Sequence, residues 1–286
     1  MKQQSEQLEK NKNDELDDLI PEIKKYLPNI TFTEVNEKLE NTGDLPTIPS
    51  IVERIYSLAS DSEASVNELA NVISNDVSMT STIFRVANSA FYAPRSEITT
   101  LKGAVMMIGF MEVKHICAAT KLISSFTEFG NELSTSIKDF WKHSLACAMI
   151  SKIIAQKIGY KNIEELYFAG LLHDFGKIII FNCFPKHFQI IALLGINKNF
   201  CFHEMENRIL GVDHTYCGSI VASRWKLPET IKNVIANHHN IPPKIENIEE
   251  ISVVECSIIH LSDYLAHKIY NSPFIPPLSN NIFLNT

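Results

Sequence analysis

The sequence predicts an all-α protein, and three observations support this fold class. From Ser50 onward, apolar residues recur at intervals of three and four, as they do along one face of a helix. No stretch shows the sustained alternation of apolar and polar residues that a half-buried strand requires. Breaks such as Gly109, Gly130 and Pro242-Pro243 separate the helical segments, because these residues end helices.

The first helices can be placed from their capping residues. Ser50 and Ser65 are suited to cap helices over 51–59 and 66–73, since a serine oxygen accepts from the first free N–H groups. The segment 76–80 ends the second helix and starts a third, which runs to Ala87. Thr99 or Thr100 opens a helix that stops at Gly109. The expected helices of this half are 51–59, 66–73, 79–87, 101–108 and 112–126.

A second helical series begins between Ser134 and Asp139, after the break at Gly130-Asn131. Pro228 is expected at a helix start, where its missing N–H is harmless. Ile241-Pro242-Pro243 ends the segment that carries His238-His239. The expected helices are 136–158, 163–182, 185–195, 203–210, 213–225, 228–239 and 249–270.

These breaks define the expected domain organisation. Residues 1–44 form a polar N-terminal extension and linker, expected to be disordered or loosely packed and to contain one short helix. Residues 45–270 form one helical domain with an N-terminal lobe, 45–130, and a second lobe, 131–270. Residues 271–286, rich in proline and asparagine, form an irregular tail.

Composition excludes several classes of protein. The formal net charge of −7 and the pI of about 5.8 argue against direct nucleic-acid binding. The N-terminus lacks the apolar region of a secretory signal, and no apolar run approaches the roughly 18 residues of a membrane-spanning helix. The six cysteines contain no C-x-x-C pair and lie mostly among apolar neighbours. We therefore expect reduced thiols, a cytoplasmic location and no membrane contact.

The segment Leu171 to Lys177 places an adjacent His173-Asp174 pair and Lys177 between two apolar runs. Polar side chains flanked so closely by core residues are expected to be buried, and buried ionised groups need partners. One interpretation is a hydrogen-bonded pair that holds helices together. Lys177 could then neutralise the Asp174 carboxylate or hold a phosphate.

Other candidates lie on successive helices. Asp139 and His143 are four residues apart and share a helix face. His214 lies in a first turn, His238-His239 close a helix, and Asp263 lies on an apolar helix. Imidazole and carboxylate groups on successive helices are what a mono- or dinuclear hydrolytic metal site is built from. Two metals that share an aspartate lower the pKa of a bridging water and bind phosphate oxygens.

The ordered set His143, His173-Asp174, Asp263 resembles the signature of the HD phosphohydrolase superfamily. More narrowly, residues 45–270 resemble the HDOD (HD-related output domain) family. The supporting segments are Leu45-Pro46-x-Ile48-Pro49, Asn88-Ser89-Ala90-Phe91-Tyr92, Ala104-x-x-x-Ile108-Gly109, Trp141-x-His143-Ser144, Ala169 to Lys177, Glu206-x-x-x-Leu210-Gly211-x-x-His214, Trp225-x-Leu227-Pro228 and His238-His239.

The resemblance implies an all-helical, two-lobed fold and a role in bacterial signalling, usually as a non-catalytic output or scaffold module. By analogy with the related HD-GYP phosphodiesterases, it also implies a set of metal ligands and a phosphate contact at Lys177. The ligand positions are Asp139 (where glutamate is usual), His143, His173, Asp174, His214, His238, His239 and Asp263. The metal would be Fe, Mn, Ni or Zn, and Asp174 and Lys177 would be catalytic if the protein is a hydrolase.

The sequence departs from the related families at two places. The Gly-Tyr-Pro loop expected after the double histidine is absent, and Asn240-Ile241-Pro242-Pro243 stands there, so hydrolysis of cyclic di-GMP is not expected. Val77 replaces a proline that is usual at a helix start, which concerns the helix and not function.

Two functional hypotheses follow. The first is a cytoplasmic regulatory module that binds signalling proteins in trans or a nucleotide-type ligand without turnover. Formation of an oligomer is left open. The alternative is a metal-dependent phosphohydrolase that acts on a nucleotide or another phosphate ester.

Some of the residues in these motifs also have structural interpretations. His238-His239 could cap a helix C-terminus. The segment Asn88 to Tyr92 could be a packed loop or could line a groove between the lobes. The remaining histidines are interpreted as surface or packing residues: His115, His187, His203, His260 and His267.

Overall fold

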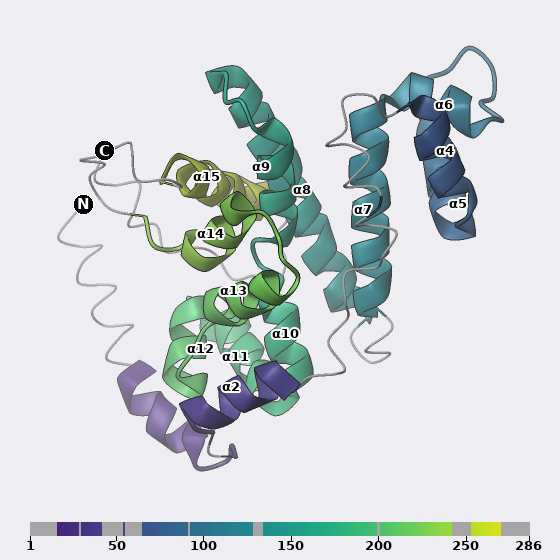
Figure 1. The fold of residues 1–286 in the computed structure, drawn as a ribbon. Helices are drawn as coiled ribbons and strands as arrows, with labels where there is room; N and C mark the ends of the chain where they lie inside the picture. Colours follow the sequence, from purple (N-terminus) through teal and green to yellow (C-terminus); the bar gives the residue numbers. More distant parts are fainter. Residues whose placement is uncertain are drawn as a thin grey trace. The chain divides into compact units, whose positions relative to one another are not determined.

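The computed structural model describes residues 16–28, 30–41, 54, 65–90, 92–127, 134–198, 201–241 and 253–269. All regular structure in these ranges is helical, which confirms the predicted all-α class (Figure 1). The chain divides into two compact units. The smaller unit is Pro46–Glu132, and the larger unit combines Met1–Leu45 with Leu133–Thr286.

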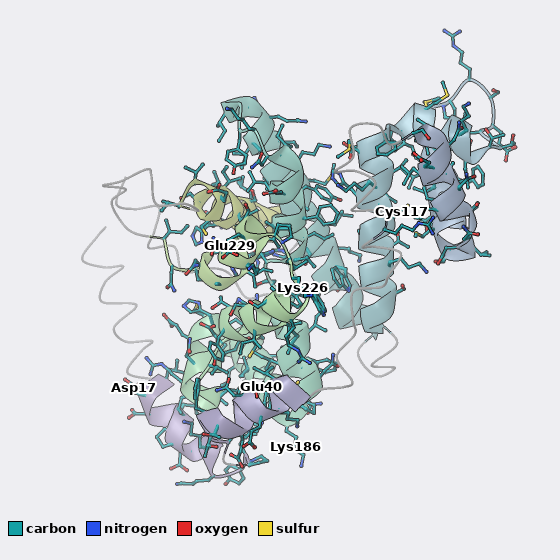
Figure 2. All side chains as sticks on the ribbon, in the orientation of Figure 1. Asp17, Glu40, Cys117, Lys186, Lys226 and Glu229 are labelled. Carbon is teal, nitrogen blue, oxygen red and sulfur yellow. The ribbon has the colours of Figure 1, made fainter. Side chains whose placement is uncertain are left out.

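The smaller unit contains four described helices: α4 (Val66–Ser74), α5 (Val77–Ala87), α6 (Leu101–Ile108) and α7 (Phe110–Thr127). Their apolar faces meet in one core, in which Leu69, Ile83 and Cys117 are fully buried; Figure 2 marks Cys117 on α7. Ser65 caps the start of α4, as predicted, and together with Glu68 it forms a reciprocal capping box. The helix expected over 51–59 lies outside the described residues, apart from position 54.

Asn88 holds the loop that follows α5. Its side-chain amide donates to the carbonyl oxygens of Phe84 and Ile98, each at 3.0 Å, and its oxygen accepts from the Ile98 N–H at 2.8 Å. Tyr92 packs against the core of the smaller unit. These contacts support the packed-loop interpretation of this segment, of which Phe91 lies outside the described residues.

The Asp76 carboxylate caps α5 and pairs with Lys121 of α7. Burial opposes ionisation of Asp76, but hydrogen bonds from Lys121, Ser78 and the Met79 N–H outweigh it and lower the pKa to about 2. Because the pKa is lower in the folded protein, the ionised carboxylate stabilises the unit above pH 4. This stabilisation is lost as the pH falls towards 2.

We expect Asp76→Asn to lower the stability of the smaller unit by about 2 kcal/mol at pH 7, with the difference vanishing near pH 2. Asparagine can still cap the helix, so the change isolates the charge. Hydrogen–deuterium exchange of α5 amides at pH 7 and at low pH measures this effect. Equal protection of both proteins at pH 7 would contradict the assignment.

The larger unit is built from two groups of helices (Figure 1). In one group, α8 (Ser134–Ile158) and α9 (Ile163–Leu172) pack with α14 (Glu229–Asn237) and α15 (Val253–Ile269). The other group contains α10 (Gly176–Cys183), α11 (Pro185–Lys198), α12 (Phe202–Leu210) and α13 (His214–Arg224). The two groups meet where α13 packs on α14 and where the chain passes from α9 to α10.

The single helix predicted over 163–182 is wrong, because the chain turns at residues 173–175. Here the N–H groups of Phe175 and Lys177 donate to carbonyls three residues back, at 3.1 and 2.9 Å, which tightens the backbone. The turn lets α10 approach α13 so closely that a Cβ on Gly176 would lie 1.9 Å from the His214 carbonyl oxygen. The His173-Asp174 pair is therefore placed at the junction of the two helix groups.

The N-terminal segment packs on the rest of the larger unit, so the expectation of a loosely packed extension with one short helix is corrected for the described part. Residues 16–24 are helical, and α2 (Phe32–Asn41) follows. Leu16, Ile20, Val35 and Leu39 are buried. These residues form two pairs spaced four apart, a narrow apolar stripe that is enough to bury one face of each helix.

Polar contacts join this segment to the larger unit across a long stretch of sequence. The Tyr216 hydroxyl donates to the Asn36 side chain at 2.7 Å, and Arg224 donates to the Leu39 carbonyl at 2.5 Å. Asp17 pairs with Arg208 of α12. Figure 2 shows Asp17 and Glu40 on the two N-terminal helices.

A membrane-spanning helix must be both long and apolar, and the described helices do not combine the two properties. No single helix among them has both the length and the apolar composition to cross a bilayer. Within the described ranges, one bent pair of helices, Leu101–Ile108 and Phe110–Lys121 with 107° between them, is long and apolar enough when its two parts are taken together.

Candidate metal centre

The predicted ligand residues come from both helix groups of the larger unit. His143 lies on α8, His173 and Asp174 lie in the turn after α9, and Asp263 lies on α15. From the other side, His214 begins α13, and His238 and His239 follow α14. Together they form two groups of four residues that both contain Asp174.

The first group consists of His143, His173, Asp174 and Asp263, and all four side chains are buried. The Nε2 atom of His143 lies 2.8 Å from Asp263 Oδ1. The Nε2 atom of His173 lies 3.5 Å from that same oxygen and 3.5 Å from Asp174 Oδ2. Potential ligand atoms from three separate chain segments therefore meet at one point.

The second group consists of Asp174, His214, His238 and His239. Asp174 Oδ1 lies 3.2 Å from His214 Nε2 and 3.6 Å from His238 Nε2. His214 Nε2 lies 3.1 Å from His239 Nε2. His239 is the partly exposed member of this group, while the other three are buried.

Three of these imidazoles are fixed by bonds from their other ring nitrogen. Nδ1 of His173 contacts the Gly170 carbonyl at 2.8 Å, and Nδ1 of His238 contacts the Val234 carbonyl at 3.1 Å. Nδ1 of His214 lies 2.5 Å from the Glu206 carboxylate. A proton on Nδ1 donates in each case, so Nε2 is the ring nitrogen directed into the centre and the one that would bind a metal.

Five of the converging atoms have no well-directed hydrogen bond among the described residues. Nε2 of His143, His173 and His238, together with Asp174 Oδ1 and Asp263 Oδ1, are buried without such a partner. Buried polar atoms are normally paired, so this set needs an explanation. Two ligand atoms bound at about 2.1 Å to one ion lie roughly 3.0–3.4 Å apart, close to the separations seen here. The donor set therefore fits a divalent transition metal.

The charges of the two buried carboxylates in the centre also fit a divalent metal ion. Burial opposes ionisation of Asp174, but Lys177 and His173 outweigh it and hold the pKa of Asp174 well below its usual range. Asp263 is likewise buried, yet His267 and His143 hold its pKa well below the usual range. Both carboxylates are therefore anionic at neutral pH. Burial opposes protonation of His173, but Asp174 raises its pKa, so a metal would displace a proton there.

Lys177 is paired within the centre. Its ammonium lies 2.6 Å from Asp174 Oδ2, and its side chain is 5% exposed. Burial alone would lower the pKa of Lys177, but the Asp174 and Asp263 carboxylates raise it. The ammonium also lies 5.4 Å from the ring centre of Phe202. This geometry matches the interpretation in which Lys177 neutralises Asp174.

Asp139 is the predicted ligand that the structure does not bring into either group. Its carboxylate lies 2.8 Å from the Lys142 ammonium, and its side chain is 30% exposed. It remains one helical turn from His143, as expected. Asp139 and His143 share a helix face, but the Asp139 carboxylate does not reach the converging ligand atoms.

Sequence reasoning missed two residues at the centre. Glu206 accepts from both the backbone N–H and Nδ1 of His214, and its side chain is fully buried. His267, interpreted as a surface or packing residue, places Nε2 at 3.4 Å from Asp263 Oδ1. The spacing of four between Asp263 and His267 was the available signal, because it puts both on one helix face.

The other histidines behave as packing residues or helix caps. His260 Nδ1 contacts the His238 carbonyl at 3.0 Å, and the His203 ring stacks on His239 at 4.7 Å. His187 contacts the Pro28 carbonyl at 3.0 Å. His238 also occupies the C-cap position of α14, so the capping interpretation and a ligand role are compatible.

Comparison with solved structures supports the fold. An HDOD domain protein of unknown function from Geobacter sulfurreducens has 28% identity and a TM-score of 0.70, over 83% of this chain and 77% of that one. A Marinobacter aquaeolei protein, whose name proposes signal transduction, has 21% identity and a TM-score of 0.68, over 93% and 57%. A Shewanella amazonensis protein, whose name proposes a phosphohydrolase, has 20% identity and a TM-score of 0.63, over 86% and 91%. The latter two likenesses establish fold alone.

Sequence comparison identifies the family. An uncharacterised protein of Treponema pallidum is 23% identical over 207 residues, which are 71% of this chain and 39% of that relative. This chain therefore spans well under half of that relative's length. The HDOD domain family itself matches residues 45–241. The match covers most of the chain and contains every predicted ligand except Asp263, and the protein belongs to the HDOD family.

Proposed function

We propose that this protein is a bacterial cytoplasmic signalling module whose larger unit holds a divalent metal ion, Fe, Mn, Ni or Zn, and acts without turnover. The observation that carries the metal site is the convergence of buried ligand atoms, five of which have no well-directed hydrogen bond among the described residues, with three imidazoles fixed through Nδ1. The metal would hold the two helix groups together at the turn between α9 and α10.

The enclosure of the centre supports a role without turnover. The side chains of His143, Asp174 and Asp263 are at most 2% exposed. The Lys177 ammonium already forms an ion pair with Asp174. A phosphate ester would have to displace these contacts before it reached the ligands. The absence of a Gly-Tyr-Pro loop after His239 is consistent with this proposal and argues against cyclic di-GMP as a substrate. The module would therefore bind signalling proteins in trans or a nucleotide-type ligand.

The test begins with elemental analysis of wild-type protein purified anaerobically. We expect one to two equivalents of transition metal per chain, and chelation should lower the unfolding temperature because the ion binds the folded state. A screen of phosphate monoesters and diesters with the reloaded protein should show no turnover above the free metal. Wild-type protein that never binds metal would overturn the metal site.

A second candidate function is a metal-dependent phosphohydrolase, and the sharing of Asp174 by both groups favours it. When bound, a pair of divalent ions supplies Lewis-acid activation of water and phosphate. In this chain, His239 is the ligand open to solvent, and Lys177 could contact phosphate only after leaving Asp174. Turnover in the screen that His239→Gln abolishes, with the metal retained, would favour this function over the first.

A further inference from the structure

Three imidazole nitrogens surround one oxygen of Asp263. The Nε2 atoms of His143, His267 and His173 lie 2.8, 3.4 and 3.5 Å from Asp263 Oδ1. None of the described residues makes a well-directed hydrogen bond to that oxygen, although the three nitrogens lie close to it. His267 Nε2 is thus as close to Asp263 Oδ1 as His173 Nε2 is.

The position of His267 is set by the fold. It lies on α15 four residues after Asp263, so both side chains leave the same face of the helix. Its ring centre lies 4.5 Å from that of His143 on α8, and its side chain is only 9% exposed. The ring is therefore held between the two helices that supply His143 and Asp263.

The ligand position that the family resemblance assigns to Asp139 has a different environment. The Asp139 carboxylate engages Lys142, outside both groups of converging ligand atoms. The Asp139 carboxylate is thus absent from the ligand group of His143, while the His267 imidazole lies close to the His143 ring. The two observations are independent, because they concern different helices.

We infer that His267 is a further metal ligand of the first group, in place of Asp139. This inference rests on the proposed metal site. With His143, His173 and His267, the group offers three imidazoles beside Asp174 and Asp263. A nitrogen-rich set of this kind favours Fe, Ni or Zn over Mn or Mg, since carboxylate and water ligands suit the latter.

The experiment compares wild type with His267→Gln, Asp139→Asn and Lys268→Gln. Lys268 is an exposed neighbour on the same helix and serves as the matched control. Chelated proteins are titrated with Co²⁺ in competition with a chelator of known affinity, and the visible absorption of the bound ion is recorded. We expect His267→Gln to weaken binding at least about tenfold and to change the absorption bands. Asp139→Asn and Lys268→Gln should match wild type in both measurements.

The outcomes distinguish a His267 that binds the metal from a His267 that only lies beside Asp263. Weaker binding of His267→Gln with an unchanged spectrum would make His267 a positioning residue for Asp263, and would overturn the inference. Wild-type affinity and spectrum in His267→Gln would also overturn it, as would a loss in Asp139→Asn equal to that in His267→Gln. Wild-type protein that binds no metal would overturn the proposed function as well, so the two failures are distinct.

Discussion

Asp174→Asn is expected to lose metal from the whole centre, with affinity reduced at least about tenfold. Asp174 belongs to both groups of four, so its replacement removes an anionic ligand from each of them. Asparagine keeps the shape of the side chain and one oxygen but removes the negative charge that attracts the ion. Elemental analysis of the purified variant beside wild type measures the loss.

The same substitution should destabilise the chelated protein by about 3–5 kcal/mol, because it leaves the buried Lys177 ammonium without its carboxylate. For a unit of this size, such a loss lowers the unfolding temperature by roughly 6–20 °C. The double variant Asp174→Asn/Lys177→Met separates the two effects, since it also removes the stranded charge. We expect it to regain most of the stability and none of the metal. A metal-loaded double variant would contradict the role given to Asp174.

The double variant also tests whether function depends on the metal. It should restore the phenotype of a strain that lacks this protein if the module acts through partner binding alone. Failure of a stable, metal-free double variant to restore the phenotype would favour the phosphohydrolase.

Gly176→Ala should destabilise the larger unit by about 3 kcal/mol or more, because overpacking against a fixed backbone cannot relax easily. A Cβ there would lie 1.9 Å from the His214 carbonyl oxygen and 3.0 Å from the Gly218 nitrogen. Both neighbours are backbone atoms of α13, so the two helices must separate. His214 would move with α13, and the second group of ligands would open. Thermal unfolding and metal content should therefore fall together.

Gly159→Ala is the control for this prediction. Gly159 has a φ of +68°, but no atom lies within 4 Å of a Cβ placed there. The substitution should cost only about 1–2 kcal/mol, from the left-handed backbone, and should leave the metal content unchanged. Equal stability of Gly176→Ala and wild type would show that α10 and α13 can separate without loss.

The sequence predicted those parts of the centre that depend on short-range spacing. The adjacency of His173 and Asp174 and their apolar flanks were enough to predict burial, and the order of the motifs indicated which helices meet. Glu206 was not predicted as a partner of His214, because the pair is eight residues apart across a turn at Gly211. Such a contact depends on how two helices pack, which local pattern does not encode.

Asp139 and His267 show a second limit of sequence reasoning. Each lies four residues from a metal-ligand candidate on the same helix, so their spacing patterns are equivalent. The structure turns Asp139 to Lys142 and places His267 beside Asp263, a difference set by nearby partners and by side-chain conformation. The sequence was also ambiguous about the narrow apolar stripe of Leu16, Ile20, Val35 and Leu39. Such a stripe becomes part of a core only if another apolar surface covers it, and the sequence pattern does not show that surface.

The packing of the N-terminal segment on α13 has a consequence for biosynthesis. Asn36 and Leu39 bond with Tyr216 and Arg224, residues 180 and 185 positions later in the chain. At 5–20 residues per second, a ribosome takes roughly 10–40 s to supply those partners. During that interval the smaller unit can fold, while the apolar stripe of the emerging N-terminus has no docking surface. A chaperone that binds nascent chains would have its longest opportunity on these first helices.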